Sequence, residues 1–240
     1  MRTDHLFARY YNSRSDFVDG TTEFHRTLSK QIVAGSKVLE IGAGCANRTT
    51  QHLAKFASIV GTDVSSEIQG NTALAESHVF DGVRLPFPAS RFDACVSDWV
   101  IEHVEKPESH FAEVARVLKP GGIYCCRTSH LLHYYSLASR LLPFGVHVRL
   151  SNKLRGFPKG SRDPFPTYYR ANTARRIRHL CCTVGLMPKK LAAFEKDPSY
   201  GTLHPALFYP MFLYERFVNS SDLLEPFRAT LIGVMEKSVR

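Results

Sequence analysis

The feature that most constrains the fold is a regular alternation of strand-like and helix-like segments between residues 37 and 127. Short β-branched or apolar runs, typical of buried strands, alternate with segments whose apolar residues recur at helical spacing. The runs predict strands at residues 37–41, 58–62, 77–80, 91–97 and 122–127. This alternation predicts an α/β fold, in which a doubly wound and mostly parallel sheet carries helices on both faces.

The helices expected between these strands span residues 47–56, 66–76 and 107–118. Beyond the alternation, the spacing predicts a helix at 173–184, a strand at 187–194 and a largely helical tail at 207–237.

We therefore expect a single domain with four parts. They are N-terminal helices at 1–35, a cofactor-binding core at 36–130, a lid at 131–170, and the rest of the core with the helical tail at 171–240. The lid is assigned because its residues break the alternation and are rich in His, Tyr, Pro and Arg.

The composition is that of an ordinary globular protein, with 44% hydrophobic and 22% charged residues. The net charge of +9 comes from short basic clusters, which we interpret as a solvated basic face. The six cysteines contain no C-x-x-C spacing, so we expect no metal site and a reducing compartment. Since neither a signal peptide nor a long apolar span is recognisable, the expected location is cytoplasmic, with no transmembrane segment. Nothing in the sequence indicates an oligomeric state.

A glycine-rich turn follows the first expected strand, in the run Glu40-Ile-Gly42-Ala-Gly44-Cys-Ala46-Asn47. The two glycines permit a tight strand-to-helix turn and a close backbone approach to a ligand. Glu40 would repel a pyrophosphate but can hold the cationic amino-acid part of S-adenosylmethionine. Asn47 stands where a dinucleotide-binding turn has its third glycine, and the loop lacks lysine, so neither an NAD site nor a P-loop is predicted.

Asp63 ends the second expected strand. An acidic side chain at this position can accept hydrogen bonds from both ribose hydroxyls of a nucleoside. The alternative is a helix N-cap, because Ser65, Ser66 and Glu67 follow it.

Four further blocks follow in order: Asp81-Gly-Val-Arg-Leu85-Pro-Phe87-Pro, Arg91-Phe-Asp93-Ala, Ile101-Glu-His103-Val and Ala115-Arg-Val-Leu118-Lys-Pro-Gly-Gly122. Together with the glycine-rich turn, they resemble the class I methyltransferase family that includes ubiquinone and menaquinone biosynthesis methyltransferases. The resemblance covers residues 37–128. It implies S-adenosylmethionine as cofactor, S-adenosylhomocysteine as product, and methyl transfer to an oxygen, nitrogen or carbon nucleophile of a small molecule.

The family's cofactor-binding positions correspond here to Glu40, Gly42, Gly44, Asp63, Asp81, Gly82, Ser97, Asp98 and Trp99. The resemblance implies that the first three contact the methionine part and that Asp63 binds the ribose. Asp81 and the Gly82 backbone would meet the adenine, and the last three would line the methionine or methyl end. Ala46 replaces a third glycine present in many relatives, which implies a slightly altered turn.

Residues near the other strand ends are candidates for the acceptor side. His103 and His133 are candidate general bases, with a packing or capping role as the alternative for His103. The candidate substrate contacts are His130, Tyr134, Tyr169 and Arg170. Arg170 could clamp a carboxylate or phosphate of an anionic substrate, or form a salt bridge that supports the lid.

Three other functions use the same features. An enzyme of this fold could transfer or cyclise the aminocarboxypropyl arm of S-adenosylmethionine instead of its methyl group. An RNA methyltransferase fits the basic charge, but the run Ser97-Asp98-Trp99 lacks the Asn/Asp-Pro-Pro-aromatic signature of base amino methylation, which makes a nucleic acid substrate the weaker prediction. A non-catalytic binding protein could also retain the fold.

Overall fold

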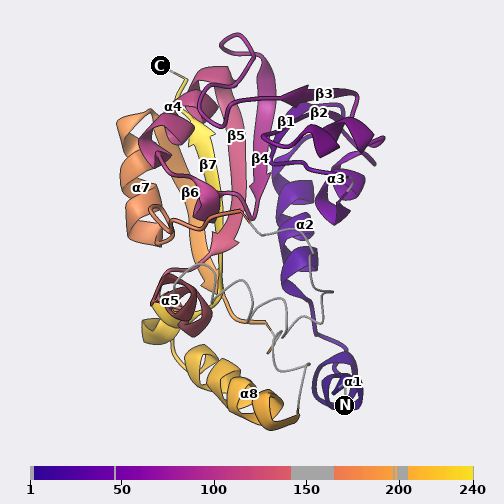
Figure 1. Ribbon diagram of the computed structural model, residues 1–240, viewed down its shortest axis with the longest axis vertical. Helices are drawn as coiled ribbons and strands as arrows, with labels where there is room; N and C mark the ends of the chain where they lie inside the picture. Colours follow the sequence, from indigo (N-terminus) through magenta and orange to yellow (C-terminus); the bar gives the residue numbers. More distant parts are fainter. Residues whose placement is uncertain (1–2, 46, 142–164, 197, 199–204, 240) are drawn as a thin grey trace.

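The computed structural model describes residues 3–45, 47–141, 165–196, 198 and 205–239 (Figure 1). Among these residues seven strands form one sheet in the order β3-β2-β1-β4-β5-β7-β6. The strands are β1 Lys37–Ile41, β2 Ser58–Asp63, β3 Glu76–Val79, β4 Phe92–Asp98, β5 Leu118–Ser129, β6 Leu186–Phe194 and β7 Thr230–Lys237. Strands β1 to β5 pair in parallel, and β7 runs antiparallel to both β5 and β6. The predicted α/β fold with a mostly parallel sheet is confirmed.

Helices cover both faces of this sheet (Figure 1). The α-helices are α1 Asp4–Phe7, α2 Gly20–Gln31, α3 Arg48–Leu53, α4 Pro107–Val117, α5 Tyr134–Leu141, α7 Ala174–Thr183 and α8 Pro205–Asn219. Shorter helical turns are η1 Ala8–Asn12, η2 Ser66–Gly70, η3 Ile101–His103 and η5 Asp222–Phe227.

Alternation along β1 explains the two apolar layers. Leu39 faces a core shared with Phe111 of α4 and Ile177 of α7. Its neighbour Val38 faces the opposite layer, which contains Phe24 of α2. Because successive residues of a strand point to opposite faces, a short apolar strand can bury side chains in both layers.

The C-terminal part of the chain differs from the sequence-based expectation. Only α8 and η5 are helical, whereas the predicted helical tail at 230–237 is strand β7, inserted between β5 and β6. Leu231 and Met235 are buried against the α4 and α7 layer, while Ile232 and Val234 are buried against the α2 layer. A strand buried on both faces has a continuous apolar run, which periodicity alone does not distinguish from a helix.

The segment between β2 and β3 also differs. The helix expected at 66–76 is reduced to the 3-10 turn η2, after which Asn71 adopts an extended conformation. The parallel pairing of β3 with β2 then begins already at Glu76.

The run 119–122 ends helix α4 as expected, but it also lies within β5. Of the proposed lid, residues 142–164 lie outside the described residues, and residues 134–141 form α5.

The parallel strands bring Ile41, Asp63, Asp98 and Ser129 to one edge of the sheet. Ile41 pairs with both Thr62 and Ser97, and Asp98 pairs with Arg127. Ligands of open α/β sheets bind at this carboxyl edge.

Candidate active site

The turn after β1 requires glycine at its first position. Gly42 has φ +75°, and a Cβ atom there would lie 2.4 Å from Cγ2 of Val100. Gly44 is also left-handed, with φ +52°, but a Cβ there would meet only the Asp63 carboxylate at 3.8 Å. The turn therefore brings bare backbone against the loop that follows β4, which is the close approach expected at a ligand-binding turn. Ala46 lies outside the described residues.

Asp63 fastens the ends of β1 and β2 together. Its Oδ2 accepts a hydrogen bond from the Gly44 amide at 2.9 Å, and its Oδ1 accepts one from the Ser65 amide at 2.8 Å. The side chain is 8% exposed, so it lies at the sheet edge rather than on the open surface. Each carboxylate oxygen has a second lone pair, which leaves acceptor capacity for a ligand hydroxyl.

Glu40 is a buried acid that lacks a full set of partners. Its Oε1 accepts a hydrogen bond from Nδ2 of Asn47 at 3.2 Å, whereas its Oε2 has no hydrogen-bond partner among the described residues. Burial raises the pKa of Glu40 to about 7. An ammonium group beside Oε2 would donate a hydrogen bond to this oxygen and would favour the ionised acid. The site therefore fits the cationic amino-acid end of S-adenosylmethionine.

Asn47 holds Glu40 and also starts helix α3. Its Oδ1 accepts hydrogen bonds from the amides of Thr49 and Thr50, which makes it the N-cap of α3. Its Nδ2 donates to Glu40 and to the Ala43 carbonyl. The residue that replaces the third glycine of a dinucleotide site therefore closes the turn by itself.

Asp81 and Gly82 form an exposed turn after β3. Oδ1 of Asp81 accepts hydrogen bonds from the amides of Val83 and Arg84, both at 2.8 Å. The Arg84 bond is the main cause of the lowered pKa of Asp81. Gly82 has φ +77°, and a Cβ there would lie 3.3 Å from Val64, the residue after Asp63. The turn therefore lies beside the end of β2.

The three candidates at the end of β4 have different surroundings. Ser97 is fully buried, and its hydroxyl is hydrogen-bonded to that of Tyr124 at 2.7 Å. Asp98 forms a bidentate ion pair with Arg127, at 2.6 and 2.7 Å. Trp99 has a left-handed backbone with φ +59° and is 41% exposed, and the Arg127 guanidinium lies 5.1 Å from its ring centroid. Only Trp99 presents its side chain to solvent.

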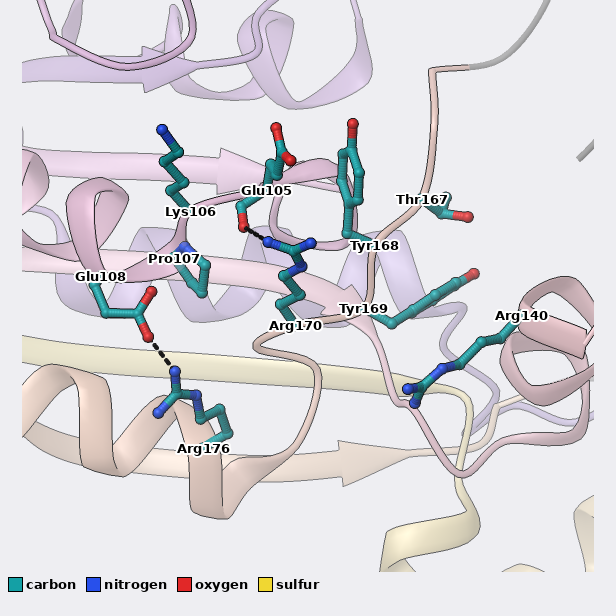
Figure 2. A pocket seen from close by; sticks show the side chains of 10 residues that line it. All are labelled: Glu105, Lys106, Pro107, Glu108, Arg140, Thr167, Tyr168, Tyr169, Arg170 and Arg176. Carbon is teal, nitrogen blue, oxygen red and sulfur yellow. Dashed lines mark hydrogen bonds and ion pairs between the residues drawn. The ribbon is translucent and has the colours of Figure 1, made fainter.

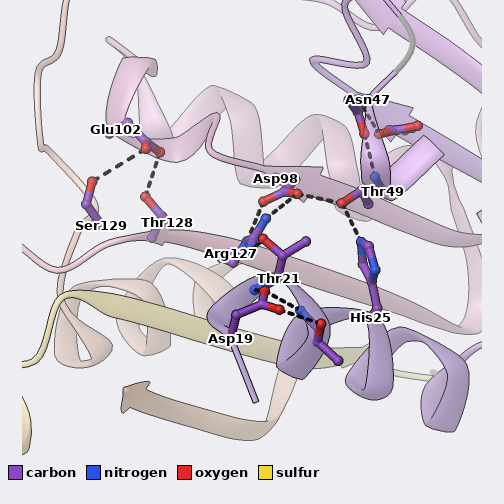
Figure 3. A network of polar contacts seen from close by, with 12 residues as sticks. Asp19, Thr21, His25, Asn47, Thr49, Asp98, Glu102, Arg127, Thr128 and Ser129 are labelled. Atoms are coloured by element: carbon purple, nitrogen blue, oxygen red, sulfur yellow. Dashed lines mark hydrogen bonds and ion pairs between the residues drawn. The ribbon is translucent and has the colours of Figure 1, made fainter. Parts of the chain in front are cut away.

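Arg127 is the centre of a polar network that the sequence analysis did not identify (Figure 3). Besides Asp98, it donates to the Thr21 hydroxyl of α2 at 3.0 Å. Asp98 accepts a third hydrogen bond, from the Thr49 hydroxyl of α3, and the same hydroxyl lies 3.0 Å from Nε2 of His25. Burial is the main cause that lowers the pKa of His25 to about 4, so this imidazole is neutral. The signal that could have revealed the network is an arginine within the apolar run of β5.

His103 is oriented by the segment that precedes Arg170. Its Nδ1 lies 2.8 Å from the Pro166 carbonyl oxygen. Since a carbonyl can only accept, Nδ1 carries the proton and a neutral ring keeps a free lone pair on Nε2.

Glu102, the buried residue before His103, also fastens the segment that precedes Arg170. Its carbonyl accepts hydrogen bonds from the amides of Tyr168 and Tyr169. Its carboxylate accepts one from the Thr128 hydroxyl at 2.8 Å. Asn172 donates to the same hydroxyl, so these contacts tie both ends of the segment to the ends of β4 and β5.

His130, His133 and Tyr134 form a separate group after β5. The His133 ring lies 4.0 Å from that of Tyr134 and 5.6 Å from that of Tyr214 of α8. Burial lowers the pKa of His133 to about 4, and burial also lowers that of His130. The Nε2 of His133 lies 3.6 Å from Oε2 of Glu195, beyond hydrogen-bond distance. No hydrogen bond or ring contact between described residues joins this group to His103.

Tyr169 and Arg170 line a cavity of about 730 Å³ between α4, α5 and α7 (Figure 2). The Tyr169 hydroxyl accepts a hydrogen bond from Ser139, and burial raises its pKa. Arg170 donates from Nη1 to the Glu105 carbonyl at 2.7 Å, and its guanidinium lies over the Tyr168 ring.

The residues that the structure describes contain neither a candidate metal site nor a helix that could span a membrane. Among these residues, no three or more His, Cys, Asp and Glu side chains lie together in a group that could hold a metal ion. Within the same residues, helices long and apolar enough to cross a membrane are absent.

Comparison with known proteins identifies relatives in sequence. The sequence-family model described as a methyltransferase domain matches residues 39–126. The demethylmenaquinone methyltransferase of Tropheryma whipplei (strain Twist) is 29% identical over 134 residues, which cover 53% of this chain and 56% of that protein. The chain thus spans about half the length of that relative. The demethylmenaquinone methyltransferase of Clavibacter sepedonicus is 31% identical over 211 residues, which cover 77% of this chain and 85% of that protein.

Solved structures agree with the fold. The crystal structure of an S-adenosylmethionine-dependent methyltransferase from Methanosarcina mazei superposes with a TM-score of 0.60 at 16% identity. The superposition covers 89% of this chain and 98% of that one, and at this identity it supports the fold. The sequence relatives agree with the fold and with the glycine turn beside the buried acid Glu40. The chain belongs to the class I S-adenosylmethionine-dependent methyltransferase family that includes the demethylmenaquinone methyltransferases.

Proposed function

We propose that this protein transfers the methyl group of S-adenosylmethionine to an oxygen, nitrogen or carbon atom of a small molecule. The observation that carries the proposal is Glu40, a buried acid whose Oε2 accepts no hydrogen bond from the described residues and which lies beside a glycine turn that requires bare backbone. S-adenosylmethionine supplies an activated methyl group on a sulfonium centre, so the protein's task is to align the acceptor and exclude water.

The cofactor roles follow the sheet edge. Glu40 holds the amino group of the methionine part, and the backbone of Gly42 and Gly44 lies against it. Asp63 binds the ribose hydroxyls, and the turn with Asp81 and Gly82 meets the adenine. Asp98 and Trp99 line the methyl end.

Ser97 contributes to this end through its backbone, because its hydroxyl is bonded to Tyr124.

His103 is the proposed general base. The Pro166 carbonyl fixes the proton on Nδ1, so Nε2 can accept the proton that an acceptor nucleophile loses. His133 is the alternative base. Its pKa of about 4 makes it a poor proton acceptor at neutral pH, which favours His103 and leaves His133, His130 and Tyr134 as walls of the acceptor site.

The acceptor is proposed to be a small molecule with an anionic group rather than a nucleic acid. The names of the relatives from T. whipplei and C. sepedonicus support a small-molecule acceptor. Arg170 is the reason to propose an anionic group on the acceptor. Its guanidinium donates to a backbone carbonyl and retains further N–H donors for a carboxylate or phosphate.

The proposal extends to organisation and location. We propose that the chain acts as one methyltransferase domain, in which residues 131–170 cover the acceptor. A cytoplasmic location is supported by the six cysteines, which are all unpaired thiols, four of them buried.

Calorimetric titration tests this function. Wild-type protein is titrated with S-adenosylmethionine, S-adenosylhomocysteine and NADH, and we expect micromolar binding of the two sulfur nucleosides alone. Asp63→Ala should weaken that binding by roughly 1.5–3 kcal/mol, the range for hydrogen bonds to a charged group. Asp16→Ala, whose carboxylate is on the surface, is the matched control. Equal affinity in a folded Asp63→Ala variant would exclude the assigned ribose site.

A further inference from the structure

The cavity beside Arg170 has an excess of positive charge. It is lined by four basic side chains, those of Lys106, Arg140, Arg170 and Arg176, and by two acidic ones, those of Glu105 and Glu108. These basic side chains come from α5, from α7, from the N-cap position before α4 and from the segment after residue 164, so the excess results from the fold rather than from a run of basic residues (Figure 2).

Two of these cations are held in place by contacts that leave donors free. Arg170 uses Nη1 for the Glu105 carbonyl, and Arg176 uses Nη2 for the Glu108 carboxylate. A guanidinium has five N–H donors, so each retains several for a ligand. Lys106 and Arg140 form no ion pair with any described residue. The cavity therefore combines two oriented guanidinium groups with two further cations.

The remaining lining suits a small molecule. Tyr168 and Tyr169 supply aromatic walls, and Thr167 supplies a hydroxyl. Ser139 donates to the Tyr169 hydroxyl, which fixes that ring. A volume of about 730 Å³ is in the range of small-molecule sites, so the cavity can accommodate an anionic group together with part of the molecule that carries it.

The cavity is joined to the proposed methyl-transfer end. The Glu102 carbonyl accepts the Tyr168 and Tyr169 amides, and the Pro166 carbonyl contacts His103. The segment that walls the cavity is thus fastened to the residues that follow β4.

We propose that this cavity binds the phosphate monoester or diphosphate group of a small molecule, which, if the proposed function holds, is the methyl acceptor. Four cations against two carboxylates leave an excess of two positive charges, which matches a dianionic phosphate better than a monoanionic carboxylate. Guanidinium groups also bind phosphate oxygens in pairs.

The test titrates full-length protein with phenyl phosphate and with benzoate at pH 8 and low salt. Phenyl phosphate is then dianionic, since the second pKa of a phosphate ester is about 6. We expect it to bind at least tenfold more tightly than benzoate. Arg170→Gln and Arg140→Gln should each weaken phenyl phosphate binding at least tenfold, and Arg178→Gln, an exposed arginine of α7 outside the cavity, should leave it unchanged.

The outcomes separate this site from the proposed function. Arg140→Gln removes no hydrogen bond or ion pair between described residues, so its result stands even where Arg170→Gln unfolds. Equal binding of the two probes, or an equal loss in Arg178→Gln, would overturn the phosphate site. Binding of S-adenosylhomocysteine is measured in each protein. If it fails in wild type while phenyl phosphate binds, the proposed function is wrong and the phosphate site stands.

Discussion

At the scale of single residues, Glu40 destabilises the folded protein when it is ionised, and it is also the proposed partner of the cofactor's amino group. An acid in a buried position is easier to keep protonated, and its pKa of about 7 lies above the ordinary value of 4.5. Between these two values the folded protein holds a proton that the unfolded chain has lost. The free energy of unfolding therefore falls as pH rises from 4.5 to 7. Above that range the loss of stability is constant.

Glu40→Gln should remove this dependence. One pKa unit corresponds to about 1.4 kcal/mol, so the variant should gain up to about 3 kcal/mol over wild type at pH 8.5 and close to nothing at pH 4.5. Urea unfolding at both pH values measures the difference. The same variant should bind S-adenosylhomocysteine more weakly, because a neutral amide replaces the partner of the amino group. A variant that is less stable than wild type at pH 8.5 would contradict the raised pKa.

The residues of the candidate site divide by how far their partners lie along the chain. Glu40, Gly42, Gly44 and Asp63 could be proposed from the sequence because each belongs to a local pattern at the end of a strand. Arg127 could not, since its partner Thr21 is 106 residues away and only the packing of α2 on the sheet brings them together. The arginine within the apolar run of β5 indicates a buried charge, but the partner that the packing brings to it is not written in the sequence.

At the scale of elements, the sequence pattern predicted helix α4, which buries one apolar face, but assigned the apolar run of β7 to a helix. Helix α4 has one apolar face, with Phe111, Val114 and Ala115 buried. Strand β7 is buried on both faces, so its apolar run gave no period and was assigned to a helix. The turn after β1 was predictable because glycine has few alternatives where φ is positive.

That turn also yields a prediction for substitution. Gly42→Ala would combine a strained φ of +75° with a Cβ atom 2.4 Å from Val100 Cγ2. Gly35→Ala has a similar φ of +82° but meets nothing within 4 Å, which makes it the matched control for strain alone. We expect Gly42→Ala to lose about 1–3 kcal/mol more stability than Gly35→Ala, as overpacking typically costs.

Thermal unfolding of the single variants and of Gly42→Ala combined with Val100→Ala measures the steric part. The second substitution removes Cγ2 of Val100, so it should recover part of the loss. Equal stability of the two alanine variants would mean that the loop after β4 moves aside freely.

At the scale of the whole molecule, the Arg127 network connects both helices of one face to the centre of the sheet. It joins Thr21 of α2, Thr49 of α3 and Asp98 of β4 through a side chain that is 4% exposed. The same guanidinium lies against Trp99, so the packing of the helices and the position of a residue proposed to line the methyl end share one charged group. This coupling follows from a buried ion pair at the sheet edge.

Arg127→Met should therefore affect both stability and cofactor binding. Removing one partner leaves the Asp98 carboxylate without its counterion, and breaking a buried pair costs about 3–5 kcal/mol. Arg14→Met breaks the exposed pair of Arg14 with Asp16 and should leave the unfolding midpoint unchanged.

The double variant Arg127→Met with Asp98→Asn should be more stable than Arg127→Met alone, because the uncompensated charge is gone. Urea unfolding and titration with S-adenosylhomocysteine measure both effects. If the double variant is the less stable one, the hydrogen bond that Asp98 accepts from the Thr49 hydroxyl contributes more than the ion pair, and the network is held by α3 rather than by charge.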